Sequence, residues 1–100
     1  MPAYTIRVEL HDANWQHYVD MAKDLATKGI TDVITADDGI SYRLSPAEYN
    51  HVGTASIDDV LNTVKTSAAR TGKSHAVFVT EATRRKWVGL EPTQPMRRAG

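Results

Sequence analysis

Alternating apolar and polar positions predict strands in several parts of the chain. Residues 4–10 read YTIRVEL, in which tyrosine, isoleucine, valine and leucine occupy every second position. This period of two, built from β-branched and aromatic residues, is typical of a half-buried strand. Further strands are expected over residues 30–36, 49–54 and 74–80, and residues 40–44 can also extend after the turn signal Asp37-Asp38-Gly39.

Apolar residues at helical spacing predict two helices. The first covers residues 14–28, with Asp12 or Asn14 as its cap. The second begins at Ser56, followed by acidic residues that favour a helix N-terminus, and ends near Gly72. Their predicted core-facing residues are Trp15, Val19, Ala22, Leu25 and Ala26 in the first helix and Ile57, Val60, Leu61, Val64 and Ala68 in the second.

The order of these elements, β-α-β-β-α-β, predicts an α+β fold of the ferredoxin-like kind. Two right-handed crossovers then place both helices on one face of a four-stranded antiparallel sheet, with spatial strand order 4-1-3-2. The domain is expected to cover residues 1–82. Residues 83–100 form a basic C-terminal tail, predicted as a short helical turn over residues 81–87 and then extended or disordered chain.

Composition indicates the number of domains and the cellular compartment, but it does not indicate a particular reaction. The chain has 100 residues, enough for one domain, and contains no cysteine, which suits a reducing cytoplasm. No apolar stretch reaches 18 residues and no secretory signal is expected, so we predict a cytoplasmic protein with no membrane association. No nucleotide, metal or hydrolase motif is present, and we expect neither a cofactor nor a bound metal.

The net charge is zero but its distribution is uneven. Residues 1–80 carry seven basic and ten acidic side chains, a net −3, whereas residues 81–100 carry five basic and two acidic, a net +3. Basic residues near a stacking ring suit single-stranded RNA, and the candidate contacts are Arg7, Arg43, Arg84, Arg85, Lys86 and Trp87. The alternatives are that Arg7 pairs with Glu9 on the surface or lies in a covered interface, and that Trp87 belongs to a short C-terminal helix and packs on the body of the protein.

A second group of candidates follows from the predicted topology. The last strand should run antiparallel beside the first, so the end of one lies near the start of the other. This brings together the four candidate catalytic residues Glu9, His11, Asp12 and His75, next to Ser74. Histidines and carboxylates together can act as general acid and base in attack by a ribose 2′-hydroxyl or by water, and they could also bind a divalent metal. The alternative is a pair of exposed turn histidines beside a helix-capping aspartate.

A family resemblance covers roughly residues 4–80, and the segments that carry it are YTIRVELHDANWQHY, KGITDVITADDGISYRLSPAEY and SIDDVLNTV. With them the chain resembles the GhoS-type endoribonuclease antitoxins of type V toxin–antitoxin systems. The resemblance implies a ferredoxin-like fold, related to that of the small CRISPR-associated endonucleases, and cleavage of a toxin's messenger RNA. It also implies an acidic catalytic residue near the end of the first strand, where this chain has Glu9 and Asp12. The family's arginines on the middle turns of helix 1 are absent, since residues 20–23 read DMAK.

These observations leave more than one class of function open. The first hypothesis is a GhoS-like antitoxin or other RNA-interacting protein, with endoribonuclease activity as a further expectation from the resemblance. The alternative is a non-catalytic, self-associating module. It would form a homodimer through a sheet edge or through the sheet face that the two helices leave uncovered. A small metabolic enzyme is a third class, supported only by the histidine–carboxylate group.

Overall fold

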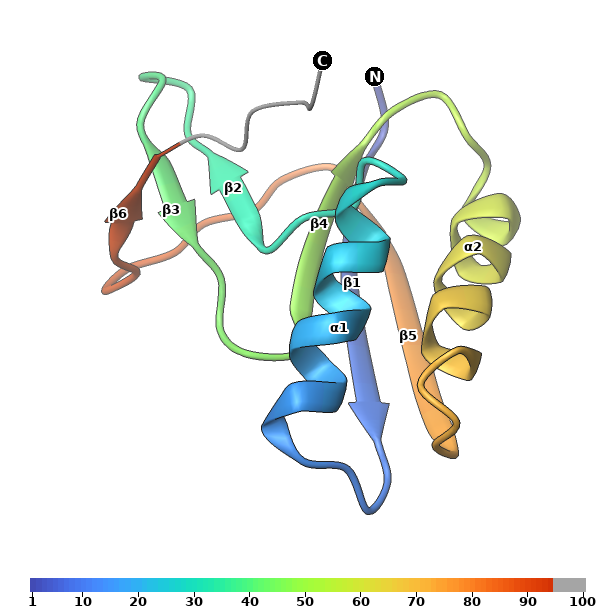
Figure 1. The fold of residues 1–100 in the computed structure, drawn as a ribbon. Helices are drawn as coiled ribbons and strands as arrows, with labels where there is room; N and C mark the ends of the chain where they lie inside the picture. The colour runs from blue at the N-terminus through green and yellow to red at the C-terminus, as the bar shows by residue number, and fades with distance from the viewer. Residues whose placement is uncertain (95–100) are drawn as a thin grey trace.

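A computed structural model describes residues 1–94 as an α+β fold, with antiparallel strands and two helices (Figure 1). One three-stranded sheet has the order β4-β1-β5, and a second, smaller one has the order β2-β3-β6. In chain order the elements are β1 (Ala3–Leu10), α1 (Trp15–Ala26), β2 (Val33–Thr35), β3 (Ser41–Arg43), β4 (Glu48–Val52), α2 (Ile57–Ala69), β5 (His75–Ala82) and β6 (Pro92–Thr93).

Strand β1 lies at the centre of the larger sheet. It pairs antiparallel with β4 on one side and with β5 along its whole length on the other. Its apolar residues face the helices, and its polar residues face the opposite side, which we call the open face. The predicted alternation is therefore confirmed.

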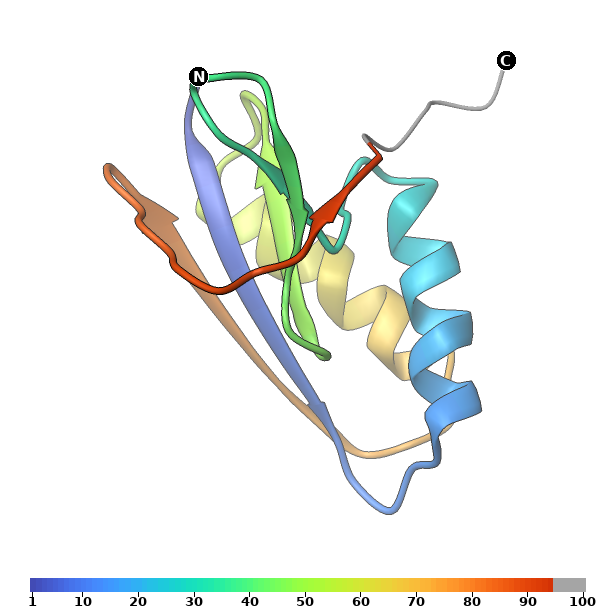
Figure 2. The same ribbon diagram turned by 90° about the vertical axis from the view of Figure 1, so that its left-hand side faces the viewer.

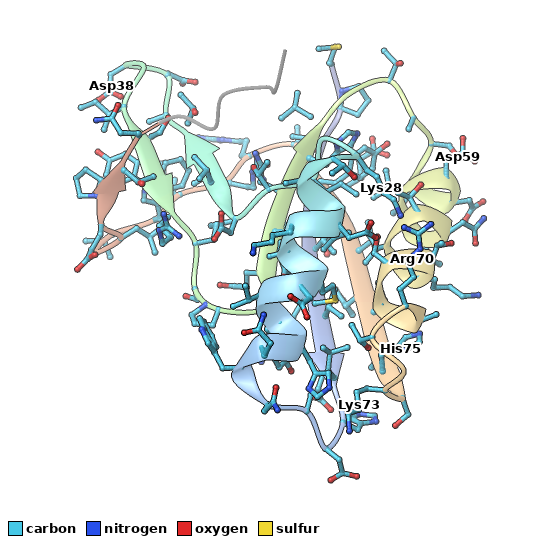
Figure 3. The ribbon with its side chains drawn as sticks, in the orientation of Figure 1. Lys28, Asp38, Asp59, Arg70, Lys73 and His75 are labelled. Atoms are coloured by element: carbon cyan, nitrogen blue, oxygen red, sulfur yellow. The ribbon has the colours of Figure 1, made fainter. Side chains whose placement is uncertain are left out.

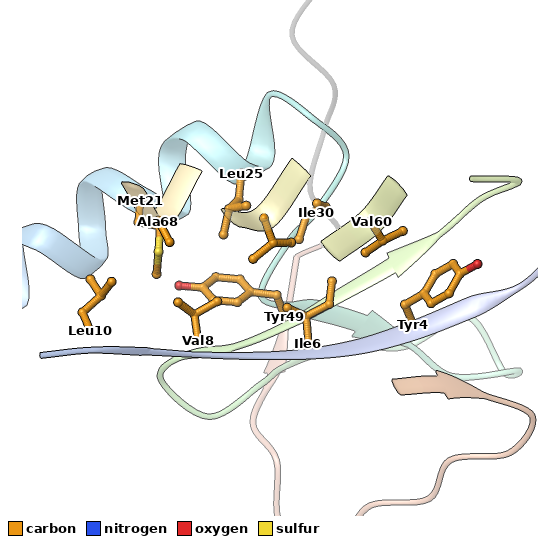
Figure 4. Close-up of a cluster of buried hydrophobic side chains, with 11 residues drawn as sticks. Tyr4, Ile6, Val8, Leu10, Met21, Leu25, Ile30, Tyr49, Val60 and Ala68 are labelled. Atoms are coloured by element: carbon orange, nitrogen blue, oxygen red, sulfur yellow. The ribbon is translucent and has the colours of Figure 1, made fainter. Parts of the chain in front are cut away.

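Both helices pack on the same face of the larger sheet, as Figure 2 shows. They bury Met21, Leu25, Val60, Val64 and Ala68 against β1, where the opposing side chains are Tyr4, Ile6, Val8 and Leu10 (Figure 4). Tyr49 of β4 completes this core, and its burial raises the pKa of its phenol to about 12. In α2 the predicted residues Val60, Val64 and Ala68 are buried, although Ile57 is 39% exposed. In α1 the predicted Leu25 is buried, and so is Met21, which the predicted stripe did not include. Trp15, which the helical stripe included, is instead 67% exposed.

Local signals set the helix ends. Asn14, rather than Asp12, caps α1: its side chain accepts a hydrogen bond from His17 N at 3.2 Å, and the His17 ring accepts one from Asn14 N at 3.0 Å. Ser56 caps α2 by accepting from Asp59 N at 3.1 Å. Gly29, which follows α1, has a φ of +75°, a conformation that costs little only for glycine.

An ion network joins the exposed ends of the two helices (Figure 3). Asp24 of α1 contacts Arg70, just past α2, at 2.9 Å and Lys28 at 3.3 Å. Hydrogen bonding to the Ser67 hydroxyl, followed by the bond and charge of Lys28 and the charge of Arg70, lowers the pKa of Asp24. The carboxylate therefore stays ionised where α1 and α2 meet.

The prediction of one four-stranded sheet was wrong. Residues 33–35 do not join the larger sheet but form a hairpin with β3, closed by Gly39 at a φ of +89°. An isolated bridge pairs Thr31, two residues before β2, with Asn50 of β4 in the larger sheet. The Asn50 side chain donates to Val33 O at 3.1 Å and so takes the place of a backbone partner for β2. β2 pairs with residues 40–44 rather than with β4, because a tight turn brings residues 40–44 beside β2.

The predicted helical turn over residues 81–87 was also wrong. β5 continues to Ala82, and residues 83–91 then cross the open face of the larger sheet in irregular conformation (Figure 2). β6 ends this crossing by pairing with β3. We call residues 83–94 the strap. The remainder of the predicted disordered tail, residues 95–100, lies outside the described residues.

Replacement of Val64 by alanine tests the packing of the core. Val64 is fully buried between α2 and β1, so Val64→Ala removes two methyl groups and leaves a cavity. We expect the free energy of unfolding to fall by about 1–3 kcal/mol, measured by urea denaturation. The neighbouring exposed Lys65→Ala is the control and should change stability by less than about 0.5 kcal/mol. Equal effects of the two variants would contradict the assigned helix face.

Candidate functional site

The open face of the larger sheet carries polar and aromatic side chains at adjacent positions. Arg7 of β1 lies between Phe78 of β5 and Glu48 of β4 in the strand register. Phe78 is 70% exposed although it lies in the middle of an eight-residue strand. An exposed ring beside a guanidinium provides both a stacking surface and a phosphate partner.

Arg85 attaches the strap to the larger sheet through hydrogen bonds. Its guanidinium donates to Asn50 Oδ1 at 2.8 Å, to Thr5 Oγ1 at 3.2 Å and to Tyr4 O at 3.4 Å. Burial among these groups lowers its pKa. The predicted RNA contact is therefore turned toward the protein and holds the strap on the open face.

Trp87 packs on the body of the protein, as the alternative from the sequence predicted, but it does so from an irregular segment rather than a short helix. Its ring meets that of Tyr42 edge to face, with centroids 5.7 Å apart. Tyr42 belongs to β3, so the contact joins the strap to the smaller sheet.

A groove of about 600 Å³ separates the strap from the β2–β3 hairpin. Arg84 and Lys86 line it and are exposed, whereas Arg85 between them is half-buried. Trp87 and Tyr42 form part of its wall, and Asp37 contributes one acidic side chain. The predicted basic run therefore faces a concave, polar and partly aromatic surface that can take an anionic ligand.

Arg43 lies apart from this groove. Its guanidinium pairs with Asp32 at 3.3 Å and reaches Thr93 Oγ1 at 3.5 Å, so it supports β6. Instead of facing Arg84, it borders a second cavity of about 310 Å³, which lies between α1 and residues 45–49 and is lined mainly by apolar groups.

Glu9, His11 and Ser74 form a hydrogen-bonded chain at the opposite end of the sheet. His11 Nε2 lies 2.9 Å from Glu9 Oε1, and His11 Nδ1 lies 3.1 Å from Ser74 Oγ. A carboxylate only accepts, so in neutral His11 the proton is on Nε2 and Nδ1 accepts from the Ser74 hydroxyl. The arrangement can polarise a hydroxyl, but its side chains are exposed, with 46% of His11 and 66% of Glu9 accessible.

The other two candidate catalytic residues do not join this chain. His75 pairs in register with Leu10 and so points to the helix face, where its Nδ1 bonds Lys73 O at 3.0 Å. Asp12 is exposed in the turn after β1, with a φ of +53°. Among residues 1–94 no group of three or more histidines and carboxylates could hold a metal ion.

Comparison with known proteins adds no family to this description. No protein-family model matches the chain, and a search of the curated proteins found no match. Within the described residues, no helix is both long enough and apolar enough to cross a membrane.

Phe78 is a residue of interest that the sequence analysis did not single out, whereas Ser74 was named there only as a neighbour of the candidate catalytic residues. Phe78 alternates with Val77 and Val79, a pattern that places it on the face opposite the core. That signal was present in the sequence. The groove gave no such signal, because it depends on where the strap crosses the sheet.

Removal of the Arg85 guanidinium tests its role in holding the strap. Arg85→Ala should lower the free energy of unfolding by about 1–2 kcal/mol, since three acceptors lose a charged donor at a half-buried position. The amide of Arg43, which donates to Glu91 O, should exchange with deuterium faster. The exposed neighbour gives the control, because Arg84→Ala should leave both measurements unchanged. An unaltered exchange rate in Arg85→Ala would show that other contacts hold the strap.

Proposed function

We propose that the chain binds single-stranded RNA along the open face and the groove beside the strap, as a GhoS-like antitoxin or related RNA-interacting protein. The observation that carries the proposal is the combination of Phe78 and Arg7 on the open face with Arg84 and Lys86 in the groove. Exposed rings offer stacking surfaces to unpaired bases, and the basic side chains contact the phosphates.

The two halves of this surface lie on consecutive segments of the chain. Phe78 belongs to β5, and Arg84 lies in the strap, two residues past the end of that strand. The positive groove supplies most of the charge, and the Phe78–Arg7 pair supplies a stacking position further along the strand. Two separate contact positions suit a short stretch of RNA rather than a single nucleotide.

The arrangement of the larger sheet and the two helices supports the same proposal. The order β5-β1-β4 with both helices on one face agrees with a ferredoxin-like unit, and the Thr31–Asn50 bridge sets residue 31 beside β4, where the fourth strand of that unit belongs. We therefore treat β3 and β6 as additions to a ferredoxin-like core. Such a core exposes one sheet face, which is the face that binds RNA in several domains of this architecture.

The arrangement favours binding over cleavage. The four candidate catalytic residues are divided between two faces of the sheet, since Glu9 pairs with Ala76 on the open face and His75 pairs with Leu10 on the helix face. Glu9 also places a carboxylate beside His11, where a phosphate would have to approach. Phosphate contacts therefore extend from the groove to Arg7 and end before the Glu9–His11–Ser74 chain.

Binding is tested with a uridine- and adenine-rich RNA oligomer, followed by fluorescence anisotropy over a series of salt concentrations. The double variant Arg84→Ala, Lys86→Ala should bind more weakly and reduce the slope of log K against log salt by about 1.4, or about 0.7 for each lost phosphate contact. Phe78→Ala should weaken binding by about 1–3 kcal/mol without changing that slope.

The matched control for charge is Lys23→Ala, Lys65→Ala, which removes two exposed positive charges from the helices. It should leave both the affinity and the salt slope as in the wild type. An equal loss in the control and in the groove variant would contradict the proposed surface and indicate nonspecific attraction.

Cleavage is measured separately on a denaturing gel, with and without magnesium or manganese. We expect the wild-type protein to bind the oligomer and leave it intact. The opposite result, cutting that His11→Ala abolishes while binding persists, would show that the Glu9–His11–Ser74 chain reaches the RNA and that the protein is an endoribonuclease.

A further inference from the structure

Strand β5 forms a free edge of the larger sheet. It pairs with β1 on one side, and no other strand within residues 1–94 pairs with its second side. Figure 2 shows no described segment beyond this strand. Its outer backbone N–H and C=O groups are therefore open to a further strand.

The sequence of this edge has few of the features that usually prevent strand pairing, and Glu81 is its one acidic or basic side chain besides His75. β5 reads HAVFVTEA, with no lysine, proline or glycine in eight residues. Phe78 at its centre is 70% exposed. A long, uninterrupted edge with an exposed aromatic ring is a template for another strand, unless a charge, a bulge or a cover blocks it.

We propose that a second copy of this chain pairs with β5 in antiparallel orientation, with the two Phe78 side chains facing each other at a twofold axis. Paired residues in an antiparallel sheet lie on the same face, so the two copies keep their helices on one side only when open-face residues meet open-face residues. Pairing Phe78 with itself satisfies this rule and uses the strand from His75 to Glu81.

This register is self-complementary in charge and shape. It places His75 opposite Glu81 of the partner, Val77 opposite Val79, and Ala76 opposite Thr80. His75 and Glu81 both lie on the helix face, because they pair with Leu10 and Tyr4 in β1. His75 Nδ1 already bonds Lys73 O, which leaves Nε2 directed to a new partner when the ring is protonated.

The neighbouring helix fits the same arrangement. α2 packs mainly on β5, so the two copies of α2 would run antiparallel on the same side of the joined sheets. The joined open faces keep both grooves accessible, and the dimer does not depend on RNA.

Cross-linking tests the register, because the chain has no cysteine of its own. Ala76→Cys and Thr80→Cys are made as separate variants that keep Phe78. Directly opposed residues have Cα atoms about 4.5–5.5 Å apart, within the range of a disulfide. A mixture of the two variants should form disulfide-linked dimers under mild oxidation, whereas either variant alone should form few. Val88→Cys, at a position 95% exposed, reports random collision.

Cross-linking of the mixture no faster than that of Val88→Cys would overturn the proposal. So would equal cross-linking of the single variants and the mixture, since that result would indicate another register. Both outcomes leave the RNA proposal untouched, because neither measurement contains RNA.

Charge exchange tests the same interface by light scattering after size-exclusion chromatography. His75→Glu places two carboxylates opposite each other and should raise the dimer dissociation constant at least tenfold. Adding Glu81→Lys should restore dimerisation, because each pair is then a glutamate and a lysine. Circular dichroism checks that each variant is folded. A wild-type monomer at several hundred micromolar, or no rescue in the double variant, would overturn the inference.

Discussion

The pairing of β1 with a strand on each side is the constraint on which the rest of the structure depends. Because β1 is bonded to both β4 and β5, its alternate residues must face opposite sides of the sheet. The apolar residues of β1, at alternate positions from Tyr4 to Leu10, pack against both helices and form one core with them. The polar set, which includes Thr5, Arg7 and Glu9, leaves a second face that must be solvated or covered. Every candidate site follows from this division.

The strap covers only part of this second face of the sheet. It crosses the end of the open face near Thr5, where the Arg85 guanidinium satisfies polar groups of β1 and β4 that would otherwise lie beneath it. Further along the sheet, Phe78 remains exposed beside Arg7. The covered end becomes a groove with positive charge, and the uncovered part becomes a surface with an aromatic ring. The positive groove and the exposed ring together are the reason for proposing single-stranded RNA as the ligand.

Opposite charges are separated along the same sheet. The basic side chains Arg84 and Lys86 lie at the end where β5 leads into the strap, whereas Glu9 and His11 lie where β1 ends. These ends are a whole strand apart. An anionic ligand held at the basic end therefore meets repulsion before it reaches the histidine, and this is why the geometry favours binding over catalysis.

The sequence alone determined the local elements and the two faces. Period-two and helical patterns identified β1, β5 and both helices, and the same alternation already placed Phe78 away from the core. The nearness of Glu9 and His11 to Ser74 also followed from strand order alone. These features depend on neighbouring residues or on one antiparallel pairing, which a pattern can express.

Only the tertiary structure decided the division into two sheets and the path of the strap. The choice of β3 over the larger sheet as a partner for β2 depends on a hairpin competing with a distant strand, and on the Asn50 side chain that bonds Val33. The inward turn of Arg85 depends on acceptors 35 to 81 residues away along the chain. Such contacts have no local period, so the charge of a run such as Arg84-Arg85-Lys86 does not reveal which of its members faces the ligand and which holds the chain in place.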